Sequence, residues 1–119
     1  MTIQESAEMY METILILSNK KKNVRAIDIA KHMNFSKPSI SRAMKNLKAE
    51  SYINIDEEGN ISLTEKGYEI AQKIYERHQV LTKFFISLGI DEQIAEDDAC
   101  KIEHVISDET FDVLKKTVS

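Results

Sequence analysis

The chain has 119 residues and a net charge of −4, and 42% of its residues are hydrophobic. That size allows one compact unit or two small lobes, and the single cysteine excludes an internal disulfide. Because no apolar run approaches the length of a membrane span and no signal peptide is recognisable, we expect a cytoplasmic protein with no membrane partner.

The charge is unevenly distributed along the chain. Between Asn19 and Glu50, nine Lys and Arg stand against two acidic residues, a net charge of +7, so the remainder carries −11. A basic segment suits phosphate groups, and an acidic segment suits cations. The alternative interpretation is two differently solvated surfaces.

Two helices are predicted in the first third of the chain. The first covers residues 5–17, with Tyr10, Ile14 and Leu17 at helical spacing and Ser18-Asn19 as its end. After a polar loop, residues 24–33 form a short second helix. Its buried side is predicted to carry Ala26, Ile27, Ala30 and Met33.

A tight turn over residues 34–36 leads into a third helix. Ser36 can cap this helix, and Pro38 lies in its first turn, where a missing N–H costs nothing. Apolar residues at positions i, i+3, i+4 and i+7 predict its buried face: Ile40, Ala43, Met44 and Leu47. The residues predicted to point outward are Ser39, Ser41, Arg42, Lys45 and Asn46.

The pattern then changes to alternation, which predicts a β-hairpin with strands over 52–55 and 61–63. Thr64 precedes a long helix over 65–88, which Gly89 ends. Asp91 is a cap for a helix over 92–106. A last helix begins at Ser107 or Asp108 and ends near Val118.

Two helices joined by a tight turn and followed by a hairpin are typical of a winged helix-turn-helix, whose second helix enters the major groove of double-stranded DNA. Hydroxyl groups and the helix N-terminus suit phosphate, and the Arg42 guanidinium could pair with guanine. The alternative is that this helix only packs. The predicted DNA-binding residues are Ser36, Lys37, Pro38, Ser39, Ser41, Arg42 and Lys45.

The acidic part of the chain contains a second constellation of residues. On a helix, Cys100, Glu103 and His104 share one side, and a thiolate, a carboxylate and an imidazole suit a transition metal. His78 lies on the preceding long helix, which a short connection would fold against this one. Taken singly, Cys100 is better explained as a small buried residue.

Three segments, together with the helix-turn-helix and wing, resemble the diphtheria-toxin-repressor and manganese transport regulator family: residues 8–14, Arg77-His78 and residues 99–109. The resemblance covers essentially the whole chain. It implies a mainly α fold with one small β-hairpin, divided into a winged helix-turn-helix DNA-binding domain over 1–72 and a helical dimerisation and metal-binding domain over 73–119. It further implies a homodimeric repressor of iron or manganese homeostasis genes that binds operator DNA when loaded with a divalent metal.

The resemblance also implies a set of metal ligands. Met9, Cys100, Glu103 and His104 match the primary site of the iron-responsive branch. His78 matches a ligand of a neighbouring site, and Glu12 matches a ligand of the manganese branch. Where the iron branch has further ligands, this chain has Thr82 and Glu96, and Thr82 replaces a carboxylate poorly.

The softness of the donors bears on the choice of metal. The sulfur atoms of Met9 and Cys100 favour iron(II), cobalt(II) or nickel(II) over manganese(II). The Glu12 carboxylate is a ligand that suits manganese(II), so this metal is still an alternative. We therefore predict iron(II) ahead of manganese(II), with zinc(II), cobalt(II) and nickel(II) as further metals in vitro. Met9 alone could equally be core filler.

Three other functions are compatible with parts of this pattern. A metal-independent winged-helix repressor would use its C-terminal lobe only to dimerise. A metal storage protein would leave the basic segment and the wing unexplained. An enzyme is not expected, because Cys100 and His104 lie on one helix with no loop nearby to form an oxyanion hole.

Overall fold

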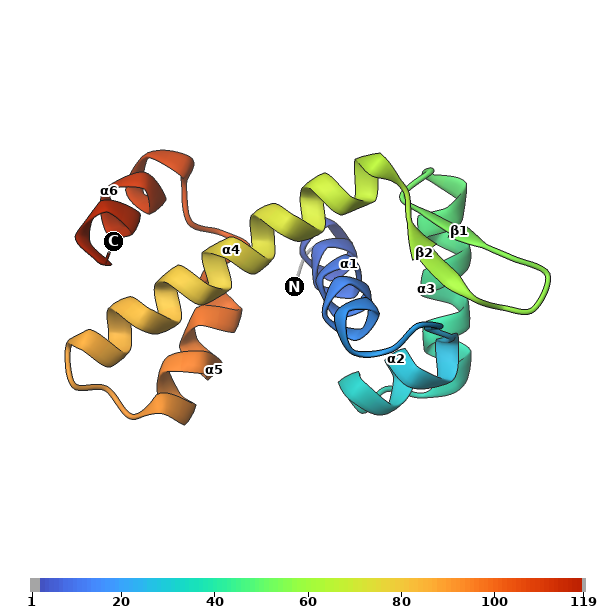
Figure 1. Cartoon of the computed structure of the whole chain (residues 1–119), viewed down its shortest axis with the longest axis horizontal. Coiled ribbons are helices and arrows are strands. Elements are labelled where there is room, and N and C mark those ends of the chain that lie inside the picture. Colours follow the sequence, from blue (N-terminus) through green and yellow to red (C-terminus); the bar gives the residue numbers. More distant parts are fainter. Residues whose placement is uncertain (1–2, 119) are drawn as a thin grey trace. The chain divides into compact units, whose positions relative to one another are not determined.

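The structure is a computed structural model that describes residues 3–118, over which the chain forms six helices and one two-stranded sheet (Figure 1). It divides into two compact units, the first ending at Gln72 and the second beginning at Lys73. The predicted fold class, mainly α with a small β-hairpin, is confirmed.

The first unit contains three helices followed by a hairpin. Helix α2 packs on both α1 and α3, while the hairpin strands contact α1 and α3. The strands are antiparallel, with Asn54 opposite Ser62, and Figure 1 shows their connecting turn extending as a wing. The elements are α1 (Ile3–Lys20), α2 (Ala26–Met33), α3 (Lys37–Ala49), β1 (Ile53–Ile55) and β2 (Ile61–Leu63).

Apolar side chains from all five elements form the core of this unit. The apolar face predicted for α3 is confirmed for Ile40, Met44 and Leu47, each of them buried. The buried residues contributed by the other elements include Met11, Ile14, Ile29, Ile53 and Ile61.

The predicted buried side of α2 is partly wrong. Ile27 is 42% exposed, whereas Ile29, which the prediction left out, is fully buried. The helix also begins later than predicted, because Val24 forms a bridge with Ile61 of the hairpin and its carbonyl oxygen accepts a hydrogen bond from the Ile61 amide at 2.7 Å. Pairing with the hairpin therefore removes Val24 from the helix and makes Arg25 its N-cap.

Helix α1 ends later than predicted, at Lys20 rather than Leu17. The Lys21 amide still donates to the Leu17 carbonyl oxygen at 2.8 Å, so the helical hydrogen bonding continues through Ser18 and Asn19. Those two residues only weakly disfavour a helix and do not stop one on their own.

The second unit consists of most of α4 (Glu65–Ser87) with α5 (Glu92–Ile102) and α6 (Asp108–Val118). Gly89 follows α4 with a φ of 92°, and the Asp91 carboxylate caps α5 by accepting from the Gln93 amide at 3.1 Å. Buried apolar residues of this unit include Ile74, Leu81, Ala95, Ala99 and Phe111.

The predicted end of the α5 helix at residue 106 is wrong, because the helix ends at Ile102. The amides of Val105 and Ile106 both donate to the Ile102 carbonyl oxygen, which turns the chain before α6 begins. Glu103 and His104 therefore lie just beyond the helix, in the turn that leads to α6.

None of the helices formed by residues 3–118 is both long and apolar enough to cross a membrane.

Candidate metal centre and DNA-binding surface

The carboxylate of Glu103 lies between two imidazole rings in the second unit. Its Oε2 atom is 2.9 Å from Nδ1 of His78 on α4, and its Oε1 atom is 3.5 Å from Nε2 of His104. Glu103 is fully buried, and the His104 side chain is only 4% exposed. An imidazole of α4 and an imidazole from the turn after α5 thus both lie beside the buried Glu103 carboxylate.

The turn beyond α5 produces this arrangement. Cys100, one helical turn earlier, is exposed. The predicted helix holds Cys100, but Glu103 is its C-cap, with its amide still donating to the Ala99 carbonyl oxygen at 2.9 Å, and His104 lies in the turn that follows. The fold brings the Glu103 carboxylate to His78 of α4.

The chemistry of this donor set fits a divalent transition metal. A carboxylate charge is costly to bury unless it is paired with a cation or coordinates a metal. Neutral imidazole nitrogens and carboxylate oxygens are ligands that manganese(II), iron(II) and zinc(II) accept. His78, Glu103 and His104 are therefore the candidate ligands that the second unit brings together.

Two further predicted ligands, Met9 and Glu12, belong to α1 of the first unit, whereas Thr82 and Glu96 belong to α4 and α5. Met9 is half-buried and Glu12 is buried, three residues apart on α1 and so on neighbouring positions of one helix face. The Thr13 hydroxyl donates to the Met9 carbonyl oxygen at 2.9 Å, so this oxygen is engaged within α1. Thr82 on α4 is half-buried, and Glu96 on α5 is exposed.

The start of α3 carries the predicted DNA-binding residues. Ser36 is the N-cap, and its hydroxyl oxygen accepts a hydrogen bond from the Ser39 amide at 3.3 Å. The Ser36 hydroxyl also donates to the Ser39 Oγ at 2.8 Å, so both hydroxyl groups already have protein partners. Lys37, Pro38, Arg42 and Lys45 are exposed, whereas Ser39 and Ser41 are half-buried.

The wing is held in shape by polar contacts of its own. The Asp56 carboxylate accepts hydrogen bonds from the amides of Asn60 and Glu58, at 2.8 and 2.9 Å. These bonds, with that from the Asn60 amide the strongest, hold the pKa of Asp56 below its ordinary value. The Arg25 guanidinium donates to the Glu58 carbonyl oxygen, which joins the base of α2 to the wing turn.

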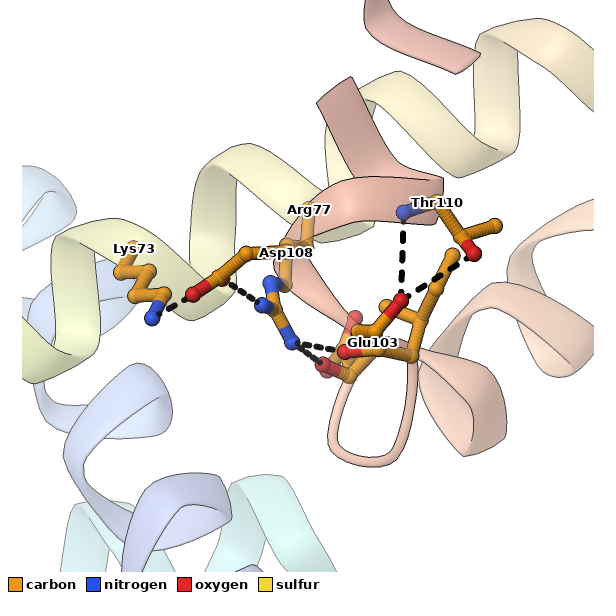
Figure 2. Close-up of polar contacts among 7 residues, drawn as sticks. Lys73, Arg77, Glu103, Asp108 and Thr110 are labelled. Carbon is orange, nitrogen blue, oxygen red and sulfur yellow. Dashed lines mark hydrogen bonds and ion pairs between the residues drawn. The ribbon is translucent and has the colours of Figure 1, made fainter. Parts of the chain in front are cut away.

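Two arginines with defined partners were missed by reasoning from the sequence. Arg25 was counted only as part of the basic segment, although it contacts the wing. Arg77 was noted only as the neighbour of His78, although its buried guanidinium contacts the turn that holds Glu103 (Figure 2). Neither partner could have been found from local spacing.

The fold and the two sites define a winged helix-turn-helix DNA-binding protein with a metal-binding domain. The chain belongs to the iron-dependent repressor family. Residues 2–60 match the description "Iron dependent repressor, N-terminal DNA binding domain", and residues 64–119 match "Iron dependent repressor, metal binding and dimerisation domain". The family resemblance predicted from the sequence is thereby confirmed.

Similar proteins cover nearly the whole chain. An uncharacterized HTH-type transcriptional regulator of Methanocaldococcus jannaschii is 35% identical over 115 residues, 95% of this chain and 92% of its own length. The transcriptional regulator MntR of Escherichia coli is 31% identical over 112 residues, 94% of this chain and 72% of MntR. The structure of the manganese regulator SloR matches with a TM-score of 0.83 and 28% identity over 98% of this chain, which spans 54% of the SloR chain.

The protein is therefore a metal-dependent transcriptional regulator, and family members are regulators rather than enzymes. The alternative of a metal-independent repressor has no support, because the C-terminal match is to a domain that binds metal as well as dimerises.

Proposed function

We propose that this protein binds operator DNA as a homodimer and represses iron or manganese homeostasis genes when a divalent metal occupies the site built around Glu103. The burial of the Glu103 carboxylate between His78 and His104 is the observation that carries this proposal. Because a regulator must share a compartment with the DNA that it binds, this function supports the expected cytoplasmic location.

The proposed ligands come from both domains, 1–72 and 73–119. His78, Glu103 and His104 supply the nitrogen and oxygen donors already gathered in the second unit. The family resemblance adds Met9 and Glu12 of α1, and Cys100 of α5. When bound, the metal supplies a positive charge that compensates the buried Glu103 carboxylate.

Iron(II) and manganese(II) are the two metals proposed. Among the similar structures, SloR is a manganese regulator, and the family is described as iron-dependent repressors. The sulfur atoms of Met9 and Cys100 favour iron(II), and the nitrogen and oxygen donors suit both metals. The preference for iron(II) stays a prediction from the sequence.

The DNA contacts are proposed to come from the exposed start of α3. Arg42 and Lys45 offer cations to base edges and phosphates, and Lys37 and Pro38 flank them. Ser36, Ser39 and Ser41 complete the proposed set, with Ser36 and Ser39 contributing through the helix N-terminus that they stabilise.

Metal and DNA are proposed to be coupled by linkage. Residues of α1 and of the second domain bind the metal best in the arrangement of domains that engages DNA. Metal and DNA then each raise the affinity for the other by the same factor.

Calorimetric titration of iron(II) or manganese(II) under anaerobic conditions, with and without a DNA duplex selected from a random pool in the presence of the metal, tests this coupling. We expect tighter metal binding when DNA is present. Equal affinities in the two titrations would exclude metal control even if DNA still bound.

A pair of variants localises the site. The double change Glu103→Gln with His104→Ala should abolish metal binding and leave only metal-independent DNA binding. Glu109→Gln, which neutralises an exposed carboxylate at the start of α6, is the matched control and should bind metal like the parent. Unchanged metal affinity in the double variant would overturn the proposed site.

A further inference from the structure

Arg77 is a buried cation whose partners lie on the turn between α5 and α6. It is 6% exposed, and its Nη1 atom donates to the carbonyl oxygens of Glu103 at 3.1 Å and Ile106 at 2.8 Å. Its Nη2 atom pairs with the Asp108 carboxylate at the start of α6 (Figure 2). One side chain of α4 therefore joins the end of α5, the turn and the start of α6.

The position of this arginine next to His78 has a specific consequence. Arg77 holds the main chain of Glu103, while His78 contacts the carboxylate of the same residue at 2.9 Å. Because α5 ends at Ile102, the Glu103 carbonyl lies in the last turn of the helix end, where carbonyl oxygens lack helical donors. The Arg77 guanidinium supplies that donor.

We propose that Arg77 is a positioning residue for the metal centre: by fixing the main chain at Glu103 and Ile106, it holds the Glu103 carboxylate between His78 and His104 before any metal binds. This inference rests on the proposed function. Arg77 makes no contact with the ion in this role; it removes the conformational freedom of the turn that carries two ligands. Groups that orient metal ligands in this way are worth about 10- to 100-fold in metal affinity.

The planar fork of arginine is required for this role. Two carbonyl oxygens and one carboxylate surround the guanidinium, and its donors can reach all three at once. A lysine ammonium keeps the charge, but it is a single point on a flexible stem and cannot span the same partners. Arg77→Lys therefore separates the geometry of the contact from its charge.

Lys73 provides the matched control. Its ammonium group lies 3.1 Å from the same Asp108 oxygen, but its side chain is 59% exposed. Lys73→Met removes a positive charge one helical turn away from Arg77 and leaves the Arg77 contacts with Glu103 and Ile106 in place. An effect of general electrostatics would appear in Lys73→Met, which loses a positive charge, whereas positioning would appear only in Arg77→Lys, which keeps the charge.

The test measures manganese(II) and anaerobic iron(II) affinity by calorimetry at a temperature where urea unfolding shows each variant to be folded. The ring signals of His78 and His104 are recorded by nuclear magnetic resonance in the metal-free proteins. We expect Arg77→Lys to bind either metal about 10- to 100-fold more weakly and to shift the metal-free His78 signals. Lys73→Met should match the parent in both measurements.

If Arg77→Lys does not fold, Asp108→Asn tests the same point, since it weakens one anchor of the guanidinium and leaves the others. A loss of metal affinity in the same direction is then expected. Folded Arg77→Lys, or failing that Asp108→Asn, with parental metal affinity and parental His78 signals would overturn the inference. Failure of the parent itself to bind metal, or parental binding by Glu103→Gln with His104→Ala, would instead overturn the proposed function on which it rests.

Discussion

Gly67, in the first turn of α4, lies directly against the main chain of Tyr52: a Cβ atom added to Gly67 would be 2.1 Å from the Tyr52 carbonyl oxygen. That oxygen also accepts hydrogen bonds from the amide and the hydroxyl of Thr64, at 3.0 and 3.1 Å. The Thr64 hydroxyl in turn accepts from the Gly67 amide at 3.2 Å. Neither backbone can retreat without breaking the contacts by which Thr64 joins the hairpin to α4.

Gly67→Ala should therefore destabilise the first unit by about 3 kcal/mol, the upper end of the usual cost of overpacking. Urea unfolding followed by circular dichroism measures the loss. Gly89→Ala is the control, because that position has a φ of 92° but no atom within 4 Å, so only backbone strain of about 1–2 kcal/mol is expected. Equal losses in the two variants would contradict the proposed clash.

Ser36→Ala should destabilise the protein by about 1 kcal/mol, since it removes the side chain that caps α3. Ser36→Asp restores a capping oxygen and should recover most of this stability. The same change places a negative charge at the proposed DNA-binding surface, so DNA affinity should fall although stability does not. Thermal unfolding and fluorescence anisotropy together separate the two roles, and parallel changes in both would argue that Ser36 acts only as a cap.

Arg42→Ala and Lys45→Ala should each weaken DNA binding, because both side chains are exposed on α3. Loss of a base contact by Arg42 should cost about 1–3 kcal/mol and relax the sequence preference at one position. Loss of a phosphate contact by Lys45 should reduce the slope of log affinity against log salt by about 1. Anisotropy titrations at several salt concentrations measure both, and Lys116→Ala on α6 should leave them unchanged.

Asp28 should give the first unit an acid-dependent contribution to stability. Its carboxylate accepts from the Lys21 ammonium at 2.7 Å and from the Arg25 amide at 2.9 Å, and these bonds, Lys21 foremost, hold the pKa of Asp28 below its ordinary 3.8. Because the pKa is lower in the folded state, the contribution is present above 3.8 and is lost as the pH falls through the folded value.

Asp28→Asn removes the carboxylate that titrates. The difference in unfolding free energy between parent and variant should be constant near neutral pH and shrink below pH 3.8. Urea unfolding across this range measures it. Glu57→Gln, which neutralises an exposed acid of the wing turn, should show no such trend.

Most of the elements could be predicted because their signals are local. The N-cap at Ser36, the apolar spacing of α3 and the alternation of the hairpin each depend on a few neighbouring residues, and the structure contains all three. The predicted helix boundaries are wrong where a residue distant in the sequence makes the deciding contact. Val24 is not part of α2, because it pairs with Ile61, a residue 37 positions later in the sequence.

The candidate metal site was predictable in composition but not in geometry. Residue types and the family resemblance named His78, Glu103 and His104, yet the spacing suggested one helix face shared with Cys100. The fold instead ends α5 at Ile102, buries the Glu103 carboxylate and leaves Cys100 exposed.

The sequence alone determined the winged helix-turn-helix, the basic segment around it and the supply of metal ligands in the acidic part, because periodicity, capping and charge are properties of neighbouring residues. Only the tertiary structure decided that His78 meets Glu103 across 25 residues and that Arg77 holds the Glu103 main chain across 26. Such contacts form when apolar side chains of α4, α5 and α6 are buried against one another, which brings residues far apart in the sequence together. No local sequence pattern encodes which of those residues come into contact.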